Sequence, residues 1–258
     1  MQIAHERGYL VVANNSDNGV DYTSCATMLA QSLKHWNPNC KVAVLTNVEQ
    51  PVEGFDLQIQ FPNGGGAGQQ DDWQCWHATP FRQTIKLEAD MLVTSSIDHW
   101  WTMLEHRDVV ISTGSRDFYQ RDSAYRGYRK LFDDNDLPDV YNAVTYWRRS
   151  KLAMEFWNYV REIFTNWNLF RQLLKFPDSK PTTDVVYAMA AQIIGPELVT
   201  MPFATYPKIV HMKTGINPFV TSDWSNELVI EHLPWALKIN AVSQWGCFHY
   251  RTKSWHGQ

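Results

Sequence analysis

The chain has 258 residues, a formal net charge of −4 and 44% hydrophobic residues. This length and this balance exclude a disordered chain and predict one folded domain with a substantial core. The acidic charge also argues against a protein that binds nucleic acid with its whole surface, so any such contact would be local.

The first half of the chain alternates strand-like and helix-like segments. An unbroken apolar run at residues 8–13 predicts a strand buried on both faces of a parallel sheet. Residues 22–35 have the period of an amphipathic helix, residues 41–46 form a second buried strand, and residues 55–61 alternate like an edge strand. The glycine-rich residues 62–68 predict either a flexible connection or a mobile flap over a substrate.

The pattern continues through the second half. Apolar runs predict further strands at residues 84–87, 91–93, 108–112 and 140–147, with a short helix at 97–105. Apolar residues at three- and four-residue steps predict one long helix over 152–174. A helix over 184–194 follows, and two short strands at 208–212 and 247–250 each carry a histidine. We therefore expect a single α/β domain with a mostly parallel central sheet flanked by helices.

Composition also bears on location. The early apolar run is too short for a signal peptide, and no stretch approaches the roughly 20 apolar residues that span a bilayer. The four cysteines form no CxxC pair, which is typical of reduced thiols. They are Cys25, Cys40, Cys75 and Cys247. We expect a cytoplasmic protein with no membrane partner.

Two carboxylates stand at the end of a buried strand. Glu88 and Asp90 follow the run at 84–87, which places them at the carboxyl edge of the sheet, where ligands of open α/β sheets bind. Two anionic groups in so apolar a run cost several kcal/mol unless they are compensated. Mg²⁺ and Mn²⁺ prefer such oxygen ligands. The alternative is a pair of solvated acids in an exposed turn.

Residues 116–130 interleave basic and aromatic side chains. Arginines on phosphates and rings on bases suit a nucleic-acid strand, whereas a solvated surface is the alternative. The candidate contacts in this segment are Arg116, Arg121, Tyr125, Arg126 and Arg129.

Four segments, in this order, resemble the GT-A-fold glycosyltransferases, particularly the glycogenin- and galactosyltransferase-like group and related enzymes of tailed phages. They are the opening strand with its loop to Asp21-Tyr22, residues 84–93, residues 141–150, and the tail motifs around His211 and His249. The sequence departs from the family at Glu88, which replaces the first Asp of its DxD motif, and at Ala143, which replaces a Gly.

The resemblance implies a metal site. Glu88 and Asp90 would bind Mn²⁺ or Mg²⁺, and one late histidine would complete the site. We favour His211, which lies on the more apolar strand. His249 remains a candidate, because Lys253 and a Trp follow it as in the family.

The resemblance also implies a nucleotide-sugar donor, with a UDP-sugar as the first choice, and an acceptor hydroxyl. Asp184 and Asn142 match positions that hold sugar or acceptor hydroxyls and are the implied catalytic residues. Residues 8–113 would form the nucleotide-binding part, and residues 114–258 the acceptor-binding and C-terminal part. The implied donor contacts are Asn14, Asn15, Tyr22, Lys86, Lys213 and Lys253.

The acceptor is the least constrained expectation. Because tailed phages glycosylate hydroxymethylated pyrimidines in their own DNA, the resemblance makes such a base the first candidate, in the cytoplasm of a bacterial host. A saccharide or protein acceptor, or an inactive module that binds a sugar or nucleotide, remains as an alternative.

Overall fold

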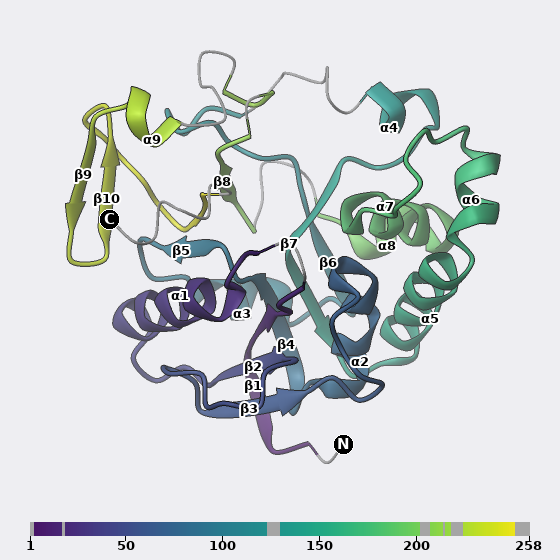
Figure 1. Cartoon of the computed structure of the whole chain (residues 1–258), viewed down its shortest axis with the longest axis horizontal. Helices are drawn as coiled ribbons and strands as arrows, with labels where there is room; N and C mark the ends of the chain where they lie inside the picture. Colours follow the sequence, from purple (N-terminus) through teal and green to yellow (C-terminus); the bar gives the residue numbers. More distant parts are fainter. Residues whose placement is uncertain are drawn as a thin grey trace.

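A central six-stranded sheet organises the protein (Figure 1). The computed structural model describes residues 3–16, 19–122, 130–201, 207–213, 215–217 and 224–250. The strand order is β3-β2-β1-β4-β7-β6; the first four strands run parallel, and β7 is antiparallel to both of its neighbours. The strands are β1 (His5–Ala13), β2 (Val42–Thr46), β3 (Leu57–Gln60), β4 (Phe81–Glu88), β6 (Val109–Thr113) and β7 (Val140–Arg148). The expected mostly parallel α/β sheet is confirmed.

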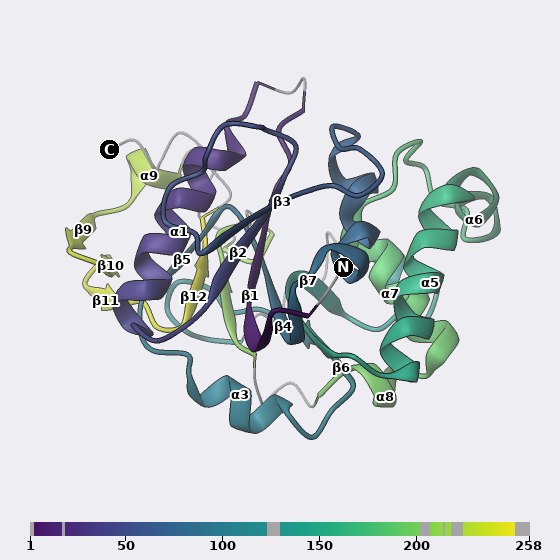
Figure 2. The same cartoon turned by 90° about the horizontal axis from the view of Figure 1, so that it is seen from below.

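Helices cover both faces of this sheet (Figure 2). On β1, Tyr9 and Val11 join the core beneath α1, whereas Leu10 joins the core beneath α5 and α7. This alternation explains why the strand is an unbroken apolar run. The helices are α1 (Tyr22–Trp36), α3 (His99–Leu104), α5 (Lys151–Thr165) and α7 (Thr183–Ile194), with the shorter η1 (Gly68–Gln74) and α2 (Cys75–Ala78).

The single helix expected over residues 152–174 is wrong. The chain forms two helices, α5 and α6 (Trp167–Leu173), which are separated at Asn166. The amide of Asn166 donates to the carbonyl oxygen of Glu162 (3.0 Å), and such side-chain bonds favour helix ends. The apolar period continues across the break because Trp167 is buried again.

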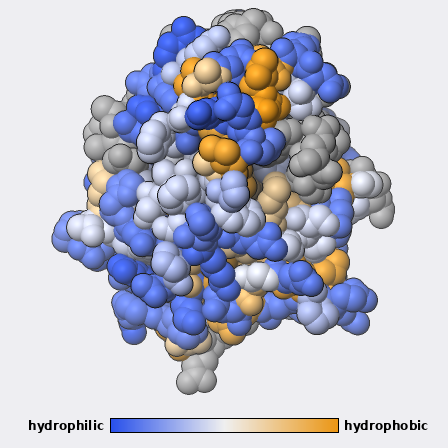
Figure 3. Space-filling model, turned by 90° about the vertical axis from the view of Figure 1, so that its left-hand side faces the viewer, coloured by the Kyte–Doolittle hydropathy of each residue, from blue (hydrophilic) through white to orange (hydrophobic). Residues whose placement is uncertain are grey.

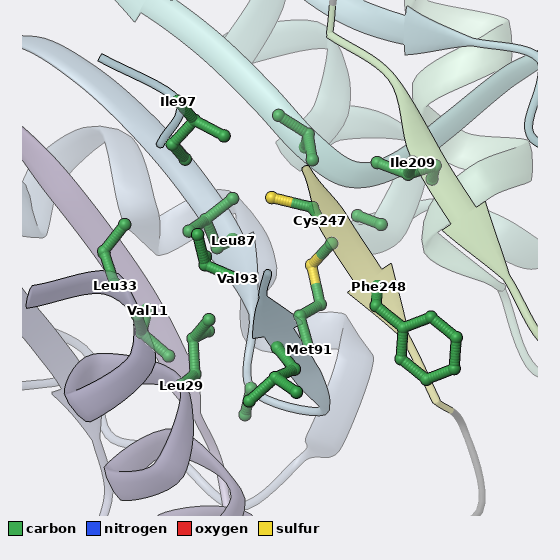
Figure 4. Packing of buried hydrophobic residues seen from close by; sticks show 14 of the residues in the cluster. Val11, Leu29, Leu33, Leu87, Met91, Val93, Ile97, Ile209, Cys247 and Phe248 are labelled. Carbon is green, nitrogen blue, oxygen red and sulfur yellow. The ribbon is translucent and has the colours of Figure 1, made fainter. Parts of the chain in front are cut away.

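A small second sheet brings the end of the chain against the end of β4. It consists of β5 (Met91–Val93), β12 (Cys247–His249) and β8 (Ile209–His211), with β12 in the middle. Figure 4 shows Met91 and Cys247 on the side of β12 that faces α1 and Phe248 on its other side, and all three belong to one buried core. Burial of these side chains fixes the register that places His249 opposite Met91.

Several short elements had no clear sequence pattern. A three-stranded sheet lies beside α1, where the Trp36 indole donates to the carbonyl oxygen of Trp235 (2.9 Å). Its strands are β9 (Ile230–Leu233), β10 (Ala236–Ile239) and β11 (Val242–Ser243). The remaining helices are α4 (Lys130–Asp134), α8 (Pro196–Val199) and α9 (Trp224–Glu227).

The surface on the α1 and β9 side is mainly hydrophilic (Figure 3). Single exposed apolar side chains there, such as Val229 and Leu233, are common on proteins. Within the described ranges, no helix combines the length and the apolar character that a membrane span requires. All four cysteines are free thiols, as expected.

Replacing Gly8 with Ala is expected to lower the free energy of unfolding by about 1–3 kcal/mol. Gly8 lies on β1, and a Cβ atom there would stand 2.4 Å from two ring atoms of Phe81. Urea denaturation measures the change. The double variant Gly8→Ala/Phe81→Leu should recover part of the loss, because the smaller side chain relieves the contact. Wild-type stability in Gly8→Ala would contradict this packing.

Candidate metal and donor site

Two carboxylates and an imidazole converge at the carboxyl end of β4. The Nε2 atom of His249 lies 2.9 Å from Oδ2 of Asp90 and 3.5 Å from Oε2 of Glu88. One potential ligand atom from each residue falls within 4.8 Å of the other two. Asp90 and His249 are buried, and Glu88 is partly exposed. Because β4 ends at Glu88, both acids lie at the sheet edge that the sequence predicts.

Strand pairing explains how residues so far apart in sequence meet. Pairing of His249 with Met91 puts the imidazole next to the turn that carries Asp90. The backbone N–H of Tyr250 donates to the carbonyl oxygen of Asp90 (3.2 Å) and closes this end of the ladder.

The geometry favours His249 over His211 as the third metal ligand, against our preference from sequence. His211 lies opposite His249 on the parallel strand β8, and the two rings stack with centroids 4.3 Å apart. Both strands are equally buried, so the apolar character of β8 did not distinguish the two histidines. Pairing of β12 with β5 brings His249 to the two carboxylates, and the identity of the histidine that binds a metal stays a prediction.

The three side chains fit a small divalent cation. Mg²⁺ and Mn²⁺ bind carboxylate oxygens in octahedral geometry, with ligand distances of about 2.1 Å for Mg²⁺, so neighbouring ligand atoms stand about 3.0 Å apart. The separations of 2.9 and 3.5 Å from His249 Nε2 are close to this value. A cation that takes these atoms as ligands would replace the hydrogen bond between His249 and Asp90, and it would offset the charges of both acids.

Three other predicted residues form a second group. The carboxylate of Asp184, in the first turn of α7, accepts a hydrogen bond from the backbone N–H of Asn142 on β7 (2.9 Å). Its other oxygen lies 3.8 Å from Nζ of Lys213, which follows β8. Lys213 is two residues from His211, so β8 connects this group to the stacked histidines. The sequence did not predict that Asp184 binds the backbone of Asn142.

Asn14 and Asn15 organise the loops at the end of β1. The Asn14 amide donates to Asp71 Oδ2 (2.8 Å), and its oxygen accepts from the N–H of Gly66 (2.9 Å), which ties down the glycine-rich loop. The side-chain oxygen of Asn15 accepts from the N–H of Tyr22 (2.8 Å) at the start of α1. Both residues line the carboxyl edge of the sheet, and their contact with a donor stays a prediction.

Lys86 points into the core. Its side chain is 1% exposed, and Nζ lies 2.6 Å from Oδ2 of Asp72 and 3.2 Å from the hydroxyl of Tyr187. Burial by itself would lower the pKa of Lys86, but Asp72 and the neighbouring Cys75 and Glu88 outweigh it, and the pKa is raised. No pattern in the sequence indicated these partners, and the donor contact of Lys86 stays a prediction.

The basic segment is internally paired where it is described. Nε of Arg116 lies 3.1 Å from Asp122, and the guanidinium of Arg121 bonds Asp117 at 2.7 Å and lies over the Tyr119 ring. Between residues 116 and 122, the two arginines and two aspartates cancel (2 − 2 = 0), which leaves little surplus charge for phosphates. Four predicted contacts lie outside the described residues: Tyr125, Arg126, Arg129 and Lys253.

Known proteins share this architecture. No protein-family profile and no curated protein sequence matches the chain. The solved structure of the galactosyltransferase LgtC with donor and acceptor sugar analogs is 14% identical, covers 94% of this chain and 87% of its own, and superposes with a TM-score of 0.53. Mouse xyloside xylosyltransferase 1, in its apo form, is 10% identical, covers 95% and 97%, and has a TM-score of 0.52. At these identities the similarity shows a shared fold.

Proposed function

We propose that this chain, which has the GT-A glycosyltransferase fold, transfers a sugar from a nucleotide-sugar donor to an acceptor hydroxyl with a divalent metal. The convergence of Glu88, Asp90 and His249 at the carboxyl edge of β4 carries the proposal. Ligands of open α/β sheets bind at this edge, and the LgtC structure of the same fold holds sugar analogs.

In this reaction the bond between the anomeric carbon and the diphosphate breaks, a bond to the acceptor oxygen forms, and the proton of the acceptor hydroxyl passes to the leaving diphosphate or to solvent. A bound Mn²⁺ or Mg²⁺ supplies positive charge to the leaving diphosphate. Lys213, whose Nζ lies 3.8 Å from Asp184, can donate to a phosphate oxygen. Asp184 can accept a hydrogen bond from a sugar or acceptor hydroxyl, and the N–H of Asn142 holds that carboxylate in one orientation.

The finer features of the donor are part of the same proposal. A UDP-sugar is the first choice, with Tyr22 against the base and Asn14 and Asn15 at the ribose side. Tyr22 begins α1 beside the loop that follows β1, where it is partly exposed, and an aromatic ring of this kind can stack on a flat base.

A hydroxymethylated pyrimidine in DNA is the first acceptor to test. The alternation of arginine and tyrosine in residues 116–130 supports it, whereas the internal pairing of Arg116 and Arg121 favours an uncharged acceptor. A saccharide or protein acceptor is therefore the second candidate. An inactive module that binds a sugar or nucleotide would keep the fold and release no diphosphate.

A donor screen tests the function and the acceptor together. The purified protein is incubated with Mn²⁺ and common nucleotide-sugars, and released nucleoside diphosphate is measured with hydroxymethylated DNA, with matched unmodified DNA and without DNA. We expect metal-dependent release with at least one donor. Stimulation only by hydroxymethylated DNA would support the DNA acceptor, and equal release in the three arms would favour a saccharide or protein. Absence of release with every donor and acceptor would contradict the transferase.

A further inference from the structure

Three polar side chains, here called the buried triad, meet in the core between β4, η1 and α7. Nζ of Lys86 on β4 lies 2.6 Å from Asp72 of η1 and 3.2 Å from the hydroxyl of Tyr187 on α7, and that hydroxyl also donates to Asp72. All three residues are at most 5% exposed. A buried ion pair of this kind is often no more stabilising than apolar residues of the same volume. Its presence therefore calls for a role beyond stability.

Two of the three residues come from the elements that carry site residues. Lys86 precedes Glu88 by two positions, so both side chains point to the same face of β4. Tyr187 follows Asp184 by three positions, almost one turn further along α7, and its side chain is buried. The contact between Lys86 and Tyr187 thus joins the strand of the metal ligands to the helix of the hydroxyl-binding carboxylate.

Asp72 connects the same point to the glycine-rich loop. The preceding residue in η1, Asp71, accepts hydrogen bonds from the N–H of Ala67 (2.9 Å) and from the amide of Asn14 (2.8 Å). Asn14 in turn accepts from the N–H of Gly66 (2.9 Å). The loop thus depends on η1 for its position, and η1 is joined to β4 through Asp72.

We propose that Lys86, Asp72 and Tyr187 are positioning residues. They hold Asp184 and the glycine-rich loop in register with β4, the strand that ends at Glu88. Hydrogen bonds between charged groups require a defined distance and direction, whereas apolar contacts would allow α7 and η1 to slide on the sheet. The consequence for turnover rests on the proposed function, and the consequence for structure does not.

The test is the double variant Lys86→Met/Asp72→Asn, which removes both charges and nearly keeps the volume. Hydrogen exchange is measured at three amides that report the positioned groups: Asn142 N–H, bonded to Asp184, Gly66 N–H, bonded to Asn14, and Ala67 N–H, bonded to Asp71. We expect at least ten-fold faster exchange at these amides and no change at Val11 in the centre of β1. The matched control is Arg148→Met/Asp108→Asn, which removes a partly exposed ion pair.

Metal affinity and turnover complete the test. Mn²⁺ affinity should stay within about two-fold of wild type, because β4, β5 and β12 hold the ligands independently of the buried triad. In the donor assay, kcat should fall at least ten-fold, and an unchanged KM for the donor would support the positioning role and count against the donor contact predicted for Lys86. A wild-type protein that releases no diphosphate would overturn the proposed function but not the positioning role, because the hydrogen-exchange data test that role independently.

Two results would overturn the positioning role. One is wild-type exchange at the three amides in the folded double variant. The other is equal acceleration at Val11, which would mark a purely structural contribution. If the double variant does not fold, Tyr187→Phe removes one hydroxyl at nearly constant volume, and the same three amides should still exchange faster than in the wild type, with no change at Val11.

Discussion

Replacing Asp90 with Asn is expected to lower metal-dependent turnover by at least about 100-fold. Asp90 is the buried carboxylate among the three candidate ligands, and its Oδ2 lies 2.9 Å from Nε2 of His249. The amide of Asn keeps the shape and one oxygen but loses the charge that offsets a divalent cation. Release of nucleoside diphosphate, measured against Mn²⁺ concentration, checks this result.

Three further variants separate the ligands. Glu88→Gln should be less severe, because Glu88 is more exposed and stands 3.5 Å from the imidazole. In His249→Ala, the release of nucleoside diphosphate should no longer respond to Mn²⁺ concentration. His211→Ala should mainly weaken substrate binding. Full activity in Asp90→Asn, or in the wild type with excess chelator, would remove the metal from the mechanism.

Replacing Trp157 with Ala is expected to lower the free energy of unfolding by about 3–5 kcal/mol. Trp157 on α5 is 2% exposed, and its ring packs edge-on against Trp147 of β7 and Tyr187 of α7, with centroids 4.8 and 5.7 Å away. Truncation would leave a cavity where α5, α7 and the sheet meet, which a packed core closes only in part.

The measurement is the midpoint of urea denaturation, followed at constant protein concentration. The matched control is Trp245→Ala, because Trp245 is 63% exposed and its truncation should change stability by less than about 0.5 kcal/mol. Similar losses in both variants would show that the interior around Trp157 is not the packed core described above.

The break at Asn166 shows the limit of periodicity as a predictor. The apolar stripe of residues 152–174 fixes which side chains face the core, and this prediction holds across the break, since Trp167 is buried. Periodicity does not report whether the backbone hydrogen bonds continue. The competing bond from the Asn166 amide to Glu162 depends on local geometry that the stripe does not encode.

By itself, the sequence determined the strands of the central sheet, their mostly parallel arrangement and the position of Glu88 and Asp90 at its carboxyl edge. These features follow from neighbouring residues, because unbroken apolar runs require burial on both faces of a sheet. The approach of His249 to these two acids depends instead on pairing between β12 and β5, which are more than 150 residues apart. The contacts of Lys86 with Asp72 and Tyr187 likewise arise only when β4, η1 and α7 pack together. The tertiary structure decided these contacts because each depends on the distance between side chains in space, which residue types and spacing alone leave open.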